Sequence, residues 1–298
     1  MPGASFLDSS FPPTVAGRFD ILTAAPTEHT PVELAPGSDG VQASAWFDRA
    51  RELHRAHFDG VQPVSQDIPF CGGILGYLGY PCGESLHGIG TTDPDGPPAA
   101  RLCVYDWCVV QDHLLRRAAL LSLPSVSAAR RRELLARLRR PAGAPDVGFR
   151  LRGGFSSNLA EQEYRRAFER IQAYIQAGDC YQVNFTQCFS AVYEGDPWQA
   201  YRIVRGLAAA PFSAYLSLGP DAALMSLSPE RFLALHGHRV ETSPIKGTRP
   251  RYSDQRADAL AAEELRASGK DRAENLMIVD LLRNDLGRSC VPGSIHVD

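Results

Sequence analysis

The stretch that decides the fold runs from residue 228 to residue 288 and holds three segments: SPERF at 228–232, SPIKGTRP at 243–250 and KDRAENLMIVDLLRNDLGR at 270–288. Between the first two, residues 231–235 and 238–242 predict a β-hairpin that turns at His236-Gly237. The third segment predicts a helix from about residue 271 to 282, after another from about 254 to 268. Antiparallel strands followed by helices are typical of an α+β fold.

The rest of the second half alternates helices with short strands. Asn158, three residues before Glu161, predicts a capped helix that ends at Gly178. Asp196 and Pro197 predict the start of another helix. Strands are expected at 181–186, 213–218, 223–228 and 294–298.

The first half contains a glycine-rich segment, FCGGILGYLGY at 70–80, which does not follow the G-x-G-x-x-G pattern of a dinucleotide loop. Glycines of this kind are more typical of a strand to which another backbone lies close. A strand is also expected at 18–24, a hairpin from 101–110 and 114–122, and helices at 44–56 and 127–140.

The segment PAGAP at 141–145 interrupts the regular pattern. We therefore predict an N-terminal domain at 1–145 and a second domain at 146–298. The predicted fold class is α+β, with mostly antiparallel sheets and helices packed outside them.

Composition excludes several classes of protein. Hydrophobic residues make up 44% of the 298 residues and charged residues 22%, as in ordinary globular proteins. A net charge of −3 gives no reason to expect nucleic acid as a partner, and no apolar run is long enough to suggest a membrane span. The seven cysteines are scattered and favour free thiols in a reducing compartment, so we expect a cytoplasmic protein.

Lys246 is the first candidate for chemistry. Pro244 restricts the approach of the chain, and Gly247 lets the backbone turn or lie close to a ligand. A lysine held in a pocket loses solvation and can become a nucleophile. The alternative is a turn residue whose amine lies in water.

Two glutamates accompany it. The predicted hairpin places Glu230 at the same open end as residues 243–246, where an acid can protonate a leaving group. The alternative for Glu230 is a surface ion pair with Arg231 or Arg249. Glu274 lies in a helix that is apolar nearly all round, which predicts a buried helix and a partner for the carboxylate. That partner would be a divalent ion such as Mg²⁺, or one of the neighbouring cations Lys270, Arg272, Arg283 and Arg288.

Together these segments resemble the chorismate-utilising enzymes, the family of anthranilate synthase component I and aminodeoxychorismate synthase component I. Further matching segments are GDCYQVN at 178–184 and APFSAY at 210–215. In the first half of the chain, the segments that resemble the family are RFD at 18–20, residues 72–80 and YDW at 105–107. Lysine at position 246, where anthranilate synthases usually have alanine, is most similar to the aminodeoxychorismate synthases.

The resemblance implies an activity and a role for each residue. Chorismate and ammonia would give 4-amino-4-deoxychorismate, for the p-aminobenzoate branch of folate synthesis. Lys246 would be the nucleophile, Glu230 the general acid and base, and Glu274 a ligand of Mg²⁺. Gly247 and Thr248 would contact the substrate.

The resemblance also implies partners. A glutamine amidotransferase subunit would supply the ammonia. Tryptophan would bind at residues that match the family's tryptophan pocket: Ser9, Ala16, Gly17, Arg18, Phe19, Pro211, Phe212 and Ser213.

Members of the family continue beyond the segments that match here, with an arginine for the substrate carboxylate and a second glutamate for Mg²⁺. The resemblance therefore leads us to expect a chain that lacks the C-terminal part of the fold. Two alternatives to the predicted activity remain. One is anthranilate synthase component I, against which Lys246 argues, and the other is a non-catalytic fragment that binds tryptophan or the amidotransferase partner.

Overall fold

Two antiparallel sheets form the centre of the computed structural model, which describes residues 1–9, 17–27, 30–62, 65, 67–89, 96–141, 143 and 147–297. The larger sheet has the order β13-β12-β1-β2-β6-β7 and the smaller the order β3-β5-β4. Their strands are β1 (Ser5–Asp8), β2 (Phe19–Thr23), β3 (Val32–Leu34), β4 (Gly73–Leu78), β5 (Ala100–Tyr105), β6 (Trp107–Asp112), β7 (Arg117–Ser122), β12 (Phe212–Ser217) and β13 (Ala223–Ser228).

Three two-stranded sheets and seven helices complete the described chain. The two-stranded sheets are formed by β8 (Phe149–Leu151) with β11 (Tyr193–Gly195), β9 (Ser156–Ser157) with β10 (Phe189–Ser190), and β14 (Ala234–His236) with β15 (Arg239–Glu241). The helices are α1 (Gly40–Phe58), α2 (Tyr80–Leu86), α3 (Ala128–Leu138), α4 (Glu161–Ala177), α5 (Pro197–Ala208), α6 (Gln255–Ala267) and α7 (Gly269–Gly287). The predicted α+β class with antiparallel sheets is confirmed.

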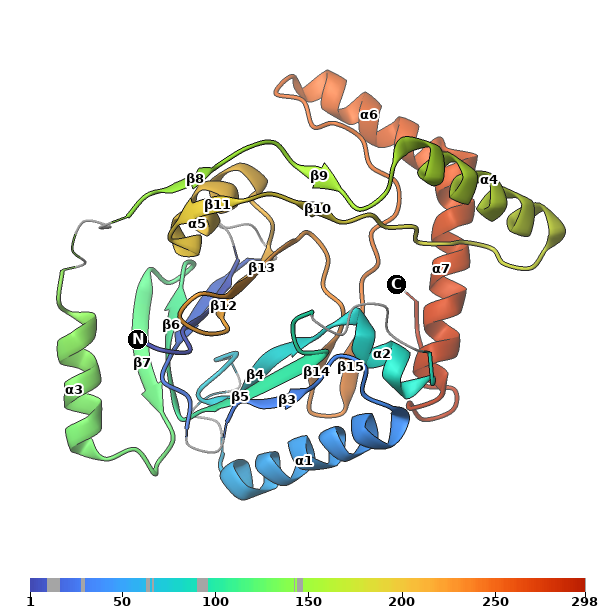
Figure 1. Ribbon diagram of the computed structural model, residues 1–298. Helices are drawn as coiled ribbons and strands as arrows, with labels where there is room; N and C mark the ends of the chain where they lie inside the picture. Colours follow the sequence, from blue (N-terminus) through green and yellow to red (C-terminus); the bar gives the residue numbers. More distant parts are fainter. Residues whose placement is uncertain are drawn as a thin grey trace.

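The core lies on both faces of the six-stranded sheet. On one face, Leu216 packs with Leu75 and Tyr105 of the three-stranded sheet, whose outer side is covered by Trp46 of α1. On the other face, α3 places Leu134 against Trp107. Helix α5 lies on the same face, and α1 runs along the lower edge of the molecule in Figure 1.

The glycine-rich segment at 70–80 forms a strand, as predicted. A methyl group on Gly76 would lie 1.9 Å from the carbonyl oxygen of Arg101 on β5, so no side chain fits there. The predicted hairpin at 101–122 is only partly correct. Residues 101–110 divide at Asp106 into β5 and β6, which belong to different sheets, and β6 pairs with β7.

Three local predictions were wrong. Residues 181–186 form no strand, because no neighbouring strand pairs with them, and residues 294–297 form none either. Helix α4 begins at Glu161 with Ala160 as its N-cap, and the Glu163 carboxylate accepts the backbone N–H of Ala160 at 2.9 Å. Asn158 instead accepts the backbone N–H of Cys188 at 2.9 Å.

Burial differs sharply along the chain. None of the described residues after Leu216 is buried, and α4, α6 and α7 have no buried side chain. The prediction that α7 is buried was therefore wrong, and Leu276 in the middle of this helix is 63% exposed. An apolar helix pattern indicates which residues could be buried, but burial itself depends on what packs against them.

The predicted division at residue 145 falls among residues outside those described. Strand β12, from the second predicted domain, pairs with β1 of the first, so the six-stranded sheet takes strands from both. The division remains a prediction. Among the helices of the described chain, none combines the length and the apolar character that a bilayer crossing requires.

Candidate active site

The β14–β15 hairpin brings Glu230 and the segment before Lys246 to the same place, as predicted. Ser228 Oγ accepts the N–H of Glu230 at 3.1 Å and donates to the carbonyl of Glu230 at 2.9 Å, which forms a tight turn at the end of β13. Glu230 Oε1 then accepts the N–H of Ile245 at 3.3 Å. The carboxylate of Glu230 therefore lies against the backbone next to Lys246.

Lys246 reaches toward α7. Its Nζ atom lies 4.0 Å from Oε1 of Glu274, and its side chain is only 22% exposed. The sequence suggested Mg²⁺ or a neighbouring cation as the partner of Glu274. The ion pair that the structure places there is with Lys246, which is 28 residues away along the chain.

Gly247 is required for this approach. Its φ angle of +71° lies in the left-handed region that favours glycine. A Cβ atom at this position would lie 2.8 Å from Leu265 Cδ1 and 3.0 Å from Asp271 Cγ. The loop therefore lies directly against α6 and α7. Thr248, the other predicted substrate contact, is exposed beside it.

A network that sequence reasoning missed holds the next residues of the loop. Arg249 donates to Glu264 of α6 at 3.1 Å and to Asp271 of α7 at 3.1 Å. Hydrogen bonding by the Ser268 side chain, followed by the nearby Arg249 charge, lowers the pKa of Asp271 below its ordinary value. The signal that could have found Asp271 is the Ser268-x-x-Asp271 spacing at the start of a helix.

These residues do not by themselves form a magnesium site. Glu274 offers one carboxylate, and the ammonium group of Lys246 beside it would repel a cation. Within the described ranges, no group of three or more His, Cys, Asp or Glu residues could hold a metal ion. Magnesium at Glu274 remains a prediction.

The residues predicted to bind tryptophan lie on two sides of the six-stranded sheet. The Ser9 N–H and Oγ both donate to Asp20 Oδ1 at 2.9 Å, and Asp20 and Phe19 are neighbours on β2, so their side chains face opposite sides. Ser213 lies opposite Asp8 in the β1–β12 pairing, next to Pro211 and Phe212. Ala16 lies outside the described residues, and Gly17 comes just before Arg18. Tryptophan binding remains a prediction.

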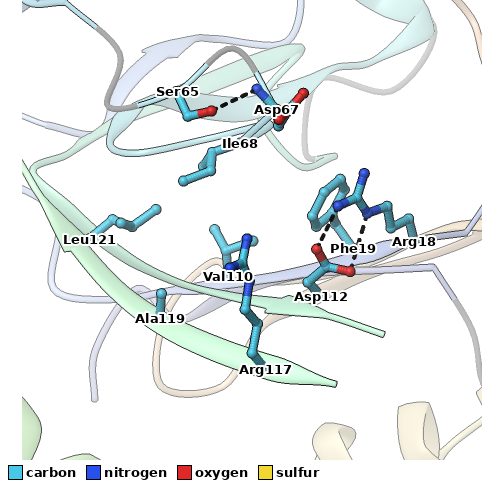
Figure 2. A pocket seen from close by; sticks show the side chains of 10 residues that line it. All are labelled: Arg18, Phe19, Ser65, Asp67, Ile68, Val110, Asp112, Arg117, Ala119 and Leu121. Carbon is cyan, nitrogen blue, oxygen red and sulfur yellow. Dashed lines mark hydrogen bonds and ion pairs between the residues drawn. The ribbon is translucent and has the colours of Figure 1, made fainter. Parts of the chain in front are cut away.

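Arg18 and Phe19 line a cavity of about 260 Å³ beside β6 and β7 (Figure 2). The Arg18 guanidinium stacks over the Phe19 ring at 4.6 Å, and its Nε and Nη2 atoms bind Asp112 at 3.2 and 2.8 Å. The N–H groups of Leu114 and Leu115 bind the same carboxylate at 3.0 Å. The remaining walls are Ser65, Asp67, Ile68, Val110, Arg117, Ala119 and Leu121.

The Arg18–Asp112 pair predicts a pH-dependent contribution to stability. The hydrogen bond from Arg18, supported by the two backbone N–H groups, lowers the pKa of Asp112 from 3.8 to about 2. Because this folded-state pKa is depressed, the contribution is complete above the ordinary pKa and is lost as the pH falls toward 2. We expect the difference in unfolding free energy between the wild type and Asp112→Asn to be constant above about pH 5 and to shrink between pH 4 and 2. Urea titrations across this range measure it, and a difference that does not change with pH would contradict the assignment.

Comparison with known proteins identifies the family. The sequence model of the chorismate binding enzyme family matches residues 15–298. Aminodeoxychorismate synthase component 1 of Klebsiella aerogenes is 40% identical over 305 residues, which cover 99% of this chain and 66% of the relative. Anthranilate synthase component 1 of Streptomyces coelicolor is 33% identical over 291 residues, which cover 91% of this chain and 55% of that relative.

A solved structure agrees with this assignment. Anthranilate synthase component I of Streptococcus pneumoniae superposes with a TM-score of 0.73 at 26% identity, covering 92% of this chain and 62% of that one. The chain thus spans less than two thirds of the length of the relatives it matches. Because the family model matches nearly the whole of this chain, the chain belongs to the chorismate binding enzyme family.

Proposed function

We propose that this chain acts as an aminodeoxychorismate synthase component, which converts chorismate and ammonia into 4-amino-4-deoxychorismate for p-aminobenzoate and folate synthesis. The observation that carries the proposal is the position of Lys246. Its side chain is 22% exposed, its Nζ atom lies 4.0 Å from Oε1 of Glu274, and the backbone segment before it is bound by Glu230. The 40% identity to an aminodeoxychorismate synthase component 1 along nearly the whole chain supports it.

In the first step, the Lys246 ammonium group gives up a proton, and the free amine adds to ring carbon 2 of chorismate. The two ring double bonds shift, and the 4-hydroxyl group leaves. Glu230 acts as the general acid, because a hydroxyl departs more easily as water than as hydroxide. Its hydrogen bond to the Ile245 N–H keeps the carboxyl group at the base of the Lys246 loop. Glu274 lies near enough to orient the amine electrostatically before it attacks.

In the second step, ammonia adds at carbon 4 and expels the Lys246 amine, which gives 4-amino-4-deoxychorismate and the free lysine. Both ring double bonds move back, so the product keeps the ring oxidation level of chorismate. We propose that a glutamine amidotransferase subunit supplies the ammonia. A cytoplasmic location, favoured by the seven free cysteines, is part of the same proposal.

The alternative activity is that of anthranilate synthase component I, favoured by the 33% identity to such a protein. A lysine nucleophile distinguishes the two, because a covalent bond at carbon 2 blocks the carbon to which anthranilate formation adds ammonia. The product therefore decides between them.

The test is an assay with chorismate and ammonium chloride, with Mg²⁺ in the buffer. The chain is assayed alone and as a chimera extended by the part of the Klebsiella relative that it does not span. We expect the chimera to form 4-amino-4-deoxychorismate, identified by mass spectrometry. Fluorescent anthranilate with release of pyruvate would instead establish the alternative. A folded chimera that consumes no chorismate would contradict both.

A further inference from the structure

The loop that carries Lys246 is held from one side by the first turn of α7. The carboxylate of Asp271 lies directly against Gly247, so close that a Cβ atom there would be 3.0 Å from Asp271 Cγ and Oδ1. The same carboxylate accepts a hydrogen bond from Arg249 Nη2 at 3.1 Å. The Asp271 side chain therefore contacts the loop at two positions after Lys246, namely Gly247 and Arg249.

The position of Asp271 is itself well defined. Its backbone N–H donates to Ser268 Oγ at 3.3 Å, which caps the start of α7. Asp271 is mostly shielded from solvent, with a side chain that is 16% exposed. Arg249 also donates to the carbonyl oxygen of Thr248 at 2.9 Å, so the guanidinium closes the turn that Gly247 begins.

Asp271 and Glu274 are three residues apart on α7 and thus lie on the same face of the helix. Asp271 holds the loop backbone, and Glu274 lies 4.0 Å from the amine at the end of the Lys246 side chain. A shift of the loop relative to Asp271 would change the direction in which Lys246 leaves the backbone, and the distance from its Nζ to Glu274 would grow.

We propose that Asp271 is a positioning residue, which fixes the Lys246 loop on α7 so that the amine is directed at Glu274 and at the substrate. The role of the amine in catalysis rests on the proposed function. The positioning itself does not, because it concerns the placement of Lys246 relative to Glu274 in the chain alone.

The sequence offers an unusually clean test, since Lys246 and Lys270 are its only lysines. A water-soluble carbodiimide activates a carboxylate, and an amine in contact with it then forms an amide while the reagent leaves as its urea. Peptide mapping by mass spectrometry measures the yield of the Lys246–Glu274 amide. We expect this amide in the wild type, and at least about a fivefold lower yield in Asp271→Asn, which keeps the shape of the side chain but not its charge.

Glu264→Gln is the matched control, because it removes the other carboxylate bound to Arg249, whereas the atoms nearest to a Cβ at Gly247 belong to Leu265 and Asp271. Its yield should stay within about twofold of the wild type. If Asp271→Asn does not fold, Arg249→Gln removes the same contact from the loop side and should lower the yield similarly. A wild-type yield in folded Asp271→Asn, or no Lys246–Glu274 amide in the wild type, would overturn the proposal.

The chimera described above separates this inference from the proposed function. In an active chimera, Asp271→Asn should lower kcat and leave KM for chorismate nearly unchanged, because the substrate still binds while the nucleophile is misplaced. If the cross-link behaves as expected and no chorismate is consumed, the proposed function fails and the positioning stands. If turnover occurs but the cross-link and kcat do not depend on Asp271, the positioning fails alone.

Discussion

Replacing Asp8 with alanine should lower the free energy of unfolding by about 3–5 kcal/mol, because it leaves a partly buried arginine without its carboxylate. The Asp8 side chain is 0% exposed, and Arg205 of α5, which is 28% exposed, binds both of its oxygens, with Nη2 2.7 Å from Oδ1. The hydroxyl of Tyr201 donates to Oδ2 at 2.9 Å. Burial, and then the charge of Asp8, raise the pKa of Tyr201, so its hydroxyl remains a donor.

This network matters because it joins β1, at the start of the chain, to α5 about 200 residues later. Helix α5 otherwise rests on the sheet mainly through the aromatic contacts of Trp198 and Tyr201 with Phe6 and Tyr215. Removal of Asp8 should therefore loosen α5 and the central strand β1 together, in one cooperative transition.

Urea denaturation followed by tryptophan fluorescence measures the loss. Asp48→Ala is the matched control, since this aspartate also pairs with an arginine but its side chain is 68% exposed, and it should cost less than about 0.5 kcal/mol. The double variant Asp8→Asn with Arg205→Gln should lose less than the sum of the single losses. Equal losses for Asp8→Ala and Asp48→Ala would mean that the buried network contributes nothing.

Some local signals in the sequence predicted local structure correctly. Asp196 and Pro197 mark the start of α5, and His236-Gly237 marks the turn between β14 and β15. Each of these depends on residues within a few positions of one another. The hairpin in turn places Glu230 beside the residues before Lys246, so this part of the site could be predicted from the sequence.

The rest of the candidate site depends on contacts between residues that are far apart in the sequence. The sequence assigned a carboxylate to α7, but it could not indicate that Lys246, and not a cation on the same helix, would be its partner. The Ser268-x-x-Asp271 spacing could have indicated that Asp271 lies at the start of α7, but its contact with Gly247 comes from the packing of α7 on the loop, which that spacing does not encode. Residues 181–186 alternate as a strand does, yet a strand exists only where another pairs with it.

Replacing Lys246 with alanine in the active chimera should lower the rate of 4-amino-4-deoxychorismate formation on the order of 10³-fold, because the covalent step is lost. Lys246→Arg should be equally inactive, since arginine keeps its proton and cannot add to the ring. Without ammonia, the wild type should accumulate an adduct at Lys246, whose mass exceeds that of the protein by chorismate less water. Intact-protein mass spectrometry followed by peptide mapping detects this adduct.

Lys270→Arg removes the only other lysine and should leave both the adduct and the rate unchanged. An adduct that persists in Lys246→Ala, or a chimera of wild-type rate without Lys246, would assign the nucleophile elsewhere. Either result would leave the 4.0 Å approach of Lys246 to Glu274 as an ion pair that stabilises the loop and does no chemistry.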